Sequence, residues 1–198
     1  MKSARFKTSK KQSKKYTLSI EEAKDGMFVK FTMMPSSYMA RSMINFTILI
    51  MVNLLSINMV KTHSNMSTLR QLALHFLIFA FSIVFFRKPA IETLTVVRNY
   101  GVELTEVQGF VICPNAWVRP WLEKTDFIPR DLIVDIIINE GFVKNGQVIF
   151  YLAVLIREAK KLTLLFPVTR PRLQDQRRIY NMARNCLFDK KKAFHTDL

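Results

Sequence analysis

The sequence predicts an α+β membrane protein in which a two-helix transmembrane hairpin is joined to an antiparallel β domain closed by a C-terminal helix. Three observations predict this fold class. Two long stretches carry no charge, the residues after them alternate between apolar and polar side chains, and apolar residues return at helical spacing near the C-terminus. The chain of 198 residues has room for one modest domain beside a membrane element.

The N-terminal region has two parts. Residues 1–15 are rich in Lys and Ser, and this composition predicts a basic, disordered tail. Residues 16–34 alternate in polarity on both sides of Asp25-Gly26, which predicts a β-hairpin with one apolar face. Because an isolated hairpin is marginal in water, we expect this one to join the sheet formed later in the chain.

Two apolar segments predict membrane helices over residues 42–60 and 69–86. A hydrocarbon core of about 30 Å takes roughly 20 helical residues, and the short link favours an antiparallel hairpin. Residues 1–41 hold ten Lys and Arg against three acids, and residues 87–198 hold eighteen against twelve. Basic residues concentrate on the cytosolic side of spans, so we expect both termini and the main domain in the cytosol. The basic N-terminal run lacks a nucleic-acid readout motif, and we expect no nucleic-acid partner.

Residues 89–198 are predicted to form the main domain. Strand patterns cover residues 91–98, 102–107, 109–113, 132–140, 147–157 and 162–166, and a loop with two tryptophans covers residues 115–126. The nine apolar residues 148–156 predict a strand buried on both faces. Pro171 is suited to the start of a helix whose apolar side includes Ile179 and Ala183. Several antiparallel strands closed by one helix are typical of a pleckstrin-homology-like domain.

Motifs of known catalytic sites are absent from the sequence. The five glycines form no phosphate-binding loop, and the three histidines share no metal-binding spacing. The sequence therefore predicts no catalytic residue, no metal site and no cofactor.

Two sets of residues are candidate binding sites. The candidate partner interface comprises Asn45, Asn53, Asn58, Trp117, Trp121, Phe127 and Pro129. The Asn side chains suit hydrogen bonds between helices, either within the hairpin or against a partner, and the Trp side chains suit either a membrane interface or a partner. The candidate lipid-headgroup contacts are Arg172, Arg177, Arg178 and Arg184, for which a solvated helix face is the alternative. A charge introduced at Ile137 or Phe150 is expected to unfold the domain.

Three segments resemble the PIG-H family in its fungal branch: Phe127–Arg130, Ile133–Phe142 and Val148–Ala153. Shorter matches extend the resemblance over nearly the whole chain: Glu92–Thr95, Gly101–Leu104, Leu164–Pro167 and Pro171–Leu173. Ile133–Phe142 is the most specific of these segments.

The resemblance implies a non-catalytic subunit of the endoplasmic reticulum complex that transfers N-acetylglucosamine from UDP-GlcNAc to phosphatidylinositol, the first step of GPI-anchor synthesis. It implies a catalytic glycosyltransferase subunit of PIG-A type and other membrane subunits as partners, and it supplies no catalytic residues. A module that binds and presents phosphatidylinositol remains the alternative.

Overall fold

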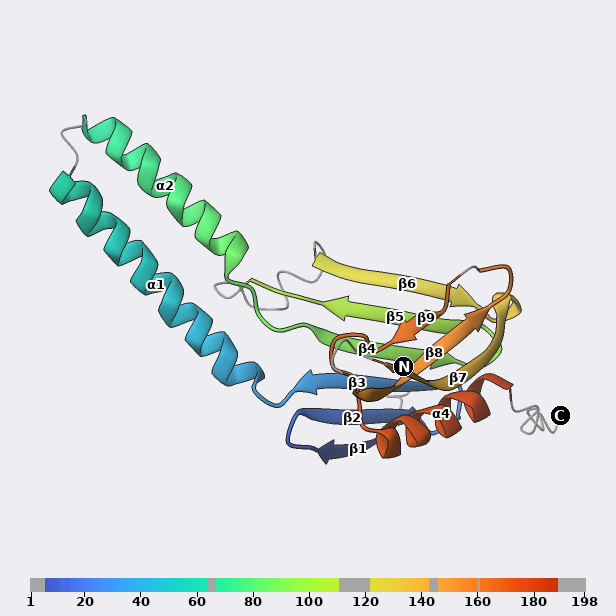
Figure 1. Cartoon of the computed structure of the whole chain (residues 1–198). Coiled ribbons are helices and arrows are strands. Elements are labelled where there is room, and N and C mark those ends of the chain that lie inside the picture. Colours follow the sequence, from blue (N-terminus) through green and yellow to red (C-terminus); the bar gives the residue numbers. More distant parts are fainter. Residues whose placement is uncertain (1–5, 64–66, 111–121, 143–145, 160, 189–198) are drawn as a thin grey trace. The chain divides into compact units, whose positions relative to one another are not determined.

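The computed structural model describes residues 6–63, 67–110, 122–142, 146–159 and 161–188 (Figure 1). The chain divides into two compact units. The first, which we call the β domain, comprises Met1–Met34, Ile91–Glu106 and Lys124–Leu198. The second, the hairpin unit, comprises Pro35–Ala90 and Val107–Glu123. Each unit is described by itself below.

A six-stranded sheet forms one side of the β domain, with its strands arranged in sequence order. The strands are β1 (Phe6–Gln12), β2 (Tyr16–Ala23), β3 (Phe28–Pro35), β4 (Ile91–Val97), β5 (Gly101–Val107) and β6 (Glu123–Pro129). Alternating residues of β2 and β3 are buried, which gives this sheet one apolar face. The antiparallel pairing of β3 with β4, from Phe28 opposite Val97 onward, joins the N-terminal hairpin to the later strands as expected.

Strand β1 contradicts the expectation of a disordered tail over residues 1–15. Residues 6–12 pair antiparallel with β2 along the whole strand, from Phe6 opposite Ala23 to Gln12 opposite Thr17. Ser9 and Lys11 also contact the C-terminal helix. These backbone and side-chain contacts offset the mutual repulsion of the lysines. The composition of the segment does not reveal such contacts.

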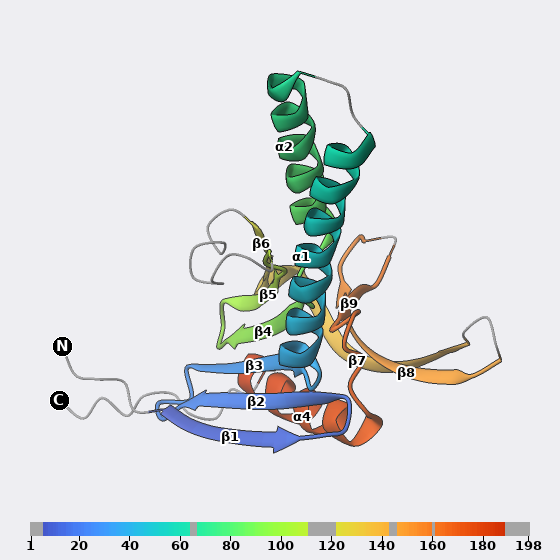
Figure 2. The same cartoon turned by 90° about the vertical axis from the view of Figure 1, so that its left-hand side faces the viewer.

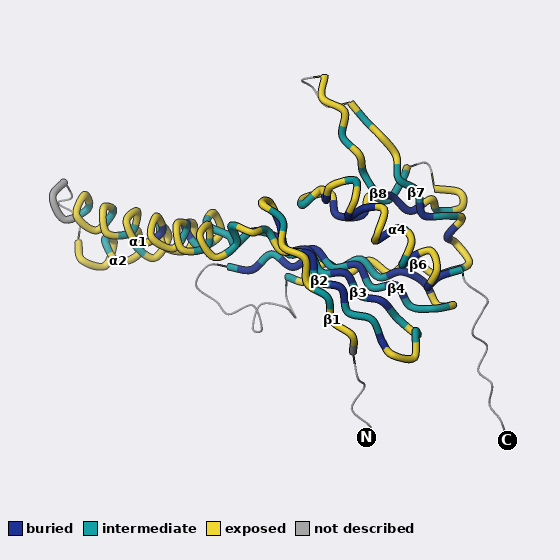
Figure 3. The backbone as a smooth tube through the Cα atoms, turned by 90° about the horizontal axis from the view of Figure 1, so that it is seen from below, coloured by how far each residue is buried: buried dark blue, intermediate teal, exposed yellow. Residues whose placement is uncertain are grey.

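A second, three-stranded sheet contains β7 (Ile133–Phe142), β8 (Val148–Ile156) and β9 (Thr163–Leu165), and a short 3-10 turn, η1 (Arg130–Leu132), precedes β7. Strand β9 pairs only with Leu152, Ala153 and Val154 of β8. Only these three β8 residues are buried, so the prediction that residues 148–156 are buried on both faces is wrong for the rest of the strand. The distal part of β7 and β8 extends away from the other strands as a two-stranded ribbon (Figure 3).

The last element is α4 (Leu173–Phe188), which begins shortly after Pro171 as expected. Its buried face includes Ile179, Ala183 and Leu187, which join residues of both sheets in one apolar core. Helix α4 packs on β4, β7 and β8 and lies against the six-stranded sheet (Figure 2). Burial of this core stabilises the domain, since apolar surface removed from water contributes about 25 cal/mol per Å².

Of two other sequence expectations, one lies largely outside the described residues and the other differs from the structure. Phe110 forms an isolated bridge with Arg87, and the rest of the expected strand over residues 109–113 lies outside the described residues apart from Gly109. The expected loop over residues 115–126 ends too late, because β6 begins at Glu123. Strand β6 is a sheet edge with only Ile128 buried, so it lacks the apolar alternation that reveals the other strands.

The hairpin unit contains α1 (Tyr38–His63) and α2 (Thr68–Phe85), which pack side by side in antiparallel directions (Figure 1). Within the described residues, two segments are long and apolar enough to cross a membrane: Tyr38–Val60 with 23 residues and Thr68–Phe85 with 18. Only 6% of the apolar window of each is buried. At 1.5 Å per residue the shorter one is about 27 Å long, close to the thickness of a hydrocarbon core.

Candidate interaction surfaces

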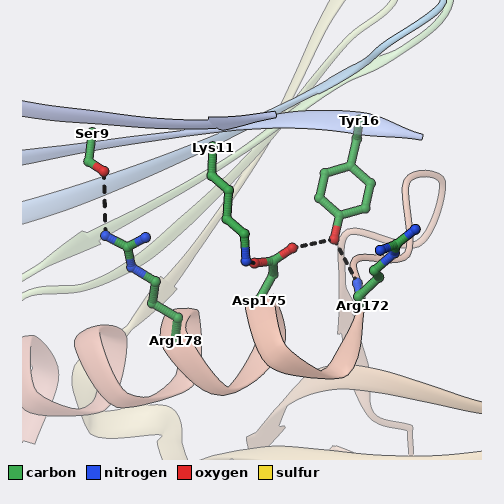
Figure 4. A network of polar contacts seen from close by, with 6 residues as sticks. All are labelled: Ser9, Lys11, Tyr16, Arg172, Asp175 and Arg178. Atoms are coloured by element: carbon green, nitrogen blue, oxygen red, sulfur yellow. Dashed lines mark hydrogen bonds and ion pairs between the residues drawn. The ribbon is translucent and has the colours of Figure 1, made fainter. Parts of the chain in front are cut away.

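A buried carboxylate attaches α4 to the N-terminal strands (Figure 4). Asp175, in the first turn of α4, accepts hydrogen bonds from Lys11 Nζ at 2.5 Å and from the Tyr16 hydroxyl at 2.6 Å. The same hydroxyl accepts a hydrogen bond from the Arg172 backbone N–H at 2.8 Å. Three contacts therefore tie β1 and β2 to the start of the helix.

Burial and bonding shift the pKa values of this group. Burial, followed by the hydrogen bond to Asp175, raises the pKa of Tyr16 from 10.0 to about 12. Burial alone would raise the pKa of Asp175, but the hydrogen bonds from Lys11 and Tyr16 outweigh it, so the pKa is lowered below 3.8. The carboxylate is therefore charged and the tyrosine neutral at physiological pH. We assign this group a structural role in positioning α4.

Two further buried polar side chains hold the segment between β9 and α4. Glu92, on the inner face of β4, accepts hydrogen bonds from the backbone N–H groups of Val168 at 2.9 Å and Thr169 at 2.8 Å. Gln176 Nε2 donates to the carbonyl oxygens of Phe150 and Pro171 at 2.8 and 2.7 Å. Sequence reasoning missed these residues, although the alternation of β4 places Glu92 on the same side as Leu94.

The four arginines proposed as lipid contacts do not form one cluster. Arg178 donates to Ser9 Oγ of β1 at 3.4 Å, whereas Arg184 lies 3.4 Å from a carboxylate oxygen of Asp135 on β7 and donates to the Tyr180 hydroxyl. Arg172 is next to Tyr16, and Arg177 is exposed. The structure thus brings Arg178 to β1 and Arg184 to β7, and it places the Arg172 backbone beside Tyr16 of β2.

The candidate partner residues that follow the two helices fall into two groups. Phe127 is 53% exposed on the edge strand β6, and Pro129 ends the same strand with its side chain exposed. Trp117 and Trp121 lie outside the described residues. Phe127 and Pro129 are therefore placed where a partner can reach them.

The asparagines of α1 are used mainly inside the hairpin unit. Asn45 Nδ2 donates to the carbonyl oxygen of Arg87 at 2.8 Å. Asn53 Nδ2 donates to the Leu49 carbonyl at 2.7 Å and to Ser82 Oγ of α2 at 3.1 Å. Asn58 is exposed on the same helix. Of the two uses expected from the sequence, packing within the hairpin is the one that the structure shows for Asn53.

The distal β7–β8 ribbon is an apolar surface that sequence reasoning did not single out. Phe142 is 81% exposed, Val148 48% and Phe150 39%. A groove of about 380 Å³ lies beside the ribbon and is lined mainly by apolar side chains, among them Phe142, Ile149 and Leu164. Ile137 is only partly buried and Phe150 is exposed, so their burial does not support the expectation that a charge at either residue unfolds the domain. Ile136 is fully buried, and a charge there should have this effect.

Among the residues that the structure describes, no three His, Cys, Asp or Glu side chains are grouped as metal ligands. These features define the class of α+β proteins with two apolar helices long enough to cross a membrane and a two-sheet domain that carries an exposed apolar ribbon.

Comparison with known proteins identifies the family within this class. Residues 93–167 match the family model of the PIG-H component of the GPI-GlcNAc transferase complex. The chain is 37% identical to the phosphatidylinositol N-acetylglucosaminyltransferase subunit GPI15 of Saccharomyces cerevisiae, over 94% of this chain and 93% of that protein. It is 33% identical to the phosphatidylinositol N-acetylglucosaminyltransferase subunit gpi15 of Schizosaccharomyces pombe, over 45% of this chain and 49% of that protein. The chain belongs to the PIG-H family.

Proposed function

We propose that this chain is a non-catalytic subunit of the phosphatidylinositol N-acetylglucosaminyltransferase of the endoplasmic reticulum membrane, which transfers GlcNAc from UDP-GlcNAc to phosphatidylinositol as the first step of GPI-anchor synthesis. The observation that carries the proposal is similarity along nearly the full length of both chains to a subunit of this enzyme. The same similarity, together with the family match over residues 93–167, supports assembly with the other subunits.

Within that complex, the chain binds and stabilises the catalytic glycosyltransferase subunit, a protein of PIG-A type. The exposed ribbon supports this role, because a two-stranded ribbon with apolar side chains in water is marginally stable and gains from being covered. The edge strand β6, with Phe127 and Pro129, is a second contact surface. In such interfaces, exposed aromatic residues contribute more to binding than their number suggests.

The hairpin unit anchors the chain in the membrane by two spans, with both termini and the β domain in the cytosol. The exposure of the two helices supports this anchoring role, because most apolar side chains of α1 and α2 are not buried against other residues in the described structure. Asn58 is exposed on α1, and we propose this exposed side of the helix as a contact for a helix of another membrane subunit. The two sheets closed by α4 support a pleckstrin-homology-like arrangement of the cytosolic domain.

The proposal is tested by affinity purification of the tagged full chain from detergent-solubilised endoplasmic reticulum membranes. The eluate is expected to contain a larger glycosyltransferase and to transfer GlcNAc from UDP-GlcNAc to phosphatidylinositol. A Phe142→Glu variant is expected to elute without this partner, while the exposed control Tyr100→Glu retains it. Elution of the wild-type chain alone, without transfer activity, would overturn the proposal.

A phosphatidylinositol-presenting module is the second candidate, favoured by the exposed Arg172 just before α4 and by three exposed arginines of the helix, Arg177, Arg178 and Arg184. Neither the ribbon groove nor the smaller cavity lined by Glu92 and Lys124 includes any of these four arginines. This candidate is therefore supported by the positive charge of the arginines and not by an enclosed site for a headgroup. Changing Arg177 and Arg178 to Glu should raise the KM for phosphatidylinositol without affecting assembly, and an unchanged KM would remove the candidate.

A further inference from the structure

Strand β8 has one edge that is largely without a neighbouring strand. It pairs with β7 along its full length, whereas on its other edge β9 pairs only with Leu152, Ala153 and Val154. Among the described residues no strand lies beside the four preceding residues, 148–151. We call these four residues the open edge of β8. They belong to the ribbon that extends away from the other strands (Figure 3).

The open edge exists because β9 ends early. If β9 continued beyond Leu165 in the same register, Phe166 would lie opposite Tyr151. Phe166 instead has a φ of 56°, in the left-handed region that bulky residues rarely adopt, and the chain leaves the sheet there. Pro167 follows, and it has no backbone N–H to donate to a neighbouring strand. The position of the next strand beside β8 therefore stays open.

The backbone groups of this edge point away from β7. The carbonyl oxygen of Phe150 accepts a hydrogen bond from Gln176 Nε2 at 2.8 Å, so this oxygen does not face β7. In an antiparallel strand the N–H and C=O of one residue point to the same side, and alternate residues share that side. The Phe150 N–H and both backbone groups of Val148 therefore point outward. None of the described residues bonds these three groups.

The opposite edge of the ribbon, on β7, is partly blocked by its own side chains. The outward N–H of Ile136 donates to Asp135 Oδ1 at 2.8 Å. The outward N–H of Glu140 donates to Asn139 Oδ1, also at 2.8 Å. Polar and charged side chains on an edge strand hinder pairing with a further strand. Of the two edges of this ribbon, the one on β8 is therefore better suited to a partner strand.

The apolar groove of about 380 Å³ follows the open edge. Its lining includes Ile149 and Leu152, whose side chains lie on opposite faces of β8, so the groove runs along the edge of the strand and not over one face. Gln176 also lines it and is fully buried, yet its Oε1 has no hydrogen-bond donor among the described residues. A buried acceptor without a donor is costly, so this site suits an occupant with N–H groups better than a purely apolar one.

We propose that the open edge of β8 is the docking site for an extended segment of the catalytic glycosyltransferase subunit, which adds a strand to this sheet. The outward backbone groups of Val148 and Phe150 supply the hydrogen bonds, and the groove favours apolar side chains at alternate positions of the incoming strand. Of the described residues that line the groove, Arg170 alone is charged, so charge complementarity favours an acidic residue beside it. The identity of the partner rests on the proposed function.

A proline at the open edge tests strand addition in the tagged full chain. Val148→Pro removes one outward N–H, and proline is tolerated as the first residue of a strand. We expect the affinity purification to recover less glycosyltransferase, by about tenfold or more, because the ring blocks pairing along the edge. Far-UV circular dichroism of each variant verifies that it folds.

Two control variants separate strand pairing from other effects of the substitution. Val148→Ala trims the same side chain but keeps the N–H. Glu140→Pro places a proline on the β7 edge, directly opposite Phe150. Both controls should retain most of the glycosyltransferase. Equal recovery by Val148→Pro and Val148→Ala would overturn the proposal.

Amide hydrogen exchange tests the same point without a substitution. The wild-type chain is compared alone and in the purified complex, with exchange read at single residues by mass spectrometry. The amides of Val148 and Phe150 should exchange several-fold more slowly in the complex, whereas the amide of Ile149, which faces β7, should change little. Unchanged exchange at Phe150 would overturn the proposal. Equal slowing at all three residues would also overturn it, because it would indicate cover without strand pairing.

Photo-cross-linking identifies the occupant. A photoreactive phenylalanine derivative in place of Leu164, which lines the groove and is 45% exposed, should cross-link to a segment of the glycosyltransferase. That segment should alternate between apolar and polar residues and contain an acid. The same derivative in place of Tyr100, which is 69% exposed outside the groove, should not cross-link to it. A cross-link from the groove to a second copy of this chain or to lipid would overturn the proposal.

The two proposals fail in different ways. A wild-type chain that elutes with the glycosyltransferase and with transfer activity, while Val148→Pro elutes with just as much of it, would refute only the docking of a strand. A wild-type chain that elutes alone and without transfer activity would refute the proposed function, and with it the partner assigned to the open edge.

Discussion

Removing a single hydroxyl group, by Tyr16→Phe, should measurably destabilise the β domain. The side chain is 1% exposed, and its hydroxyl donates to Asp175 at 2.6 Å and accepts from the Arg172 N–H at 2.8 Å. A hydrogen bond to a charged group contributes about 1.5–3 kcal/mol and a neutral one about 0.5–1.5, so the loss should be about 2–4 kcal/mol.

The assay is thermal unfolding of the full chain in detergent, with the folded fraction followed by far-UV circular dichroism. For a chain of this length the loss corresponds to a fall of about 10 °C in Tm. Tyr180→Phe is the matched control, because its hydroxyl bonds Arg184 at an exposed position. That variant should change the free energy of unfolding by less than about 0.5 kcal/mol.

The pH dependence supplies an independent check. Because the folded state raises the pKa of Tyr16, its contribution is present below pH 10 and is lost as the pH rises toward 12. The wild-type chain should therefore lose its advantage over Tyr16→Phe across this interval. A variant as stable as the wild type at neutral pH, or a constant difference between pH 10 and 12, would refute the reasoning.

Three other substitutions test separate parts of the structure. Gly101→Ala should lower the free energy of unfolding by about 3 kcal/mol or more, because the added Cβ would overlap the backbone carbonyl of Ile128. In the control Gly146→Ala the added Cβ meets no neighbour, so the loss should be only about 1 kcal/mol. Thermal unfolding measures both. Glu92→Ala leaves two backbone N–H groups without an acceptor and should lower the free energy of unfolding by about 2–4 kcal/mol; equal Tm values would show that these bonds are not needed. Acidification should remove the contribution of Asp175, whose lowered pKa means that stability is lost as the pH falls below about 4; Asp175→Asn should show a smaller loss, and identical acid profiles would contradict this.

The helices and most strands could be predicted because their signals are local. The apolar segments at 42–60 and 69–86 lie in α1 and α2, apart from Phe86, which follows directly on α2. Period-two alternation marks β2, β3 and β4. In each case the residues that determine the structure are neighbours in sequence. A long apolar run also indicated β8, although it could not indicate how much of that strand the neighbouring β9 covers.

The missed elements depend on contacts between distant residues. Strand β1 is full of lysines and is ordered by pairing with β2 and by its contacts with α4, 164 residues away in the case of Lys11 and Asp175. Strand β6 is exposed on all but one residue, so its sequence is similar to that of a loop. The division of the α4 arginines between β1 and β7 likewise follows from packing and not from helical spacing.

The most direct test of the central claim is the abundance of the catalytic glycosyltransferase subunit in membranes from cells depleted of this chain, measured with the transfer of GlcNAc to phosphatidylinositol. An accessory subunit that binds and stabilises its partner predicts that both fall together and that re-expression of the wild-type chain, but not Phe142→Glu, restores both. Undiminished transfer activity and an unchanged amount of catalytic subunit after complete depletion would contradict the account.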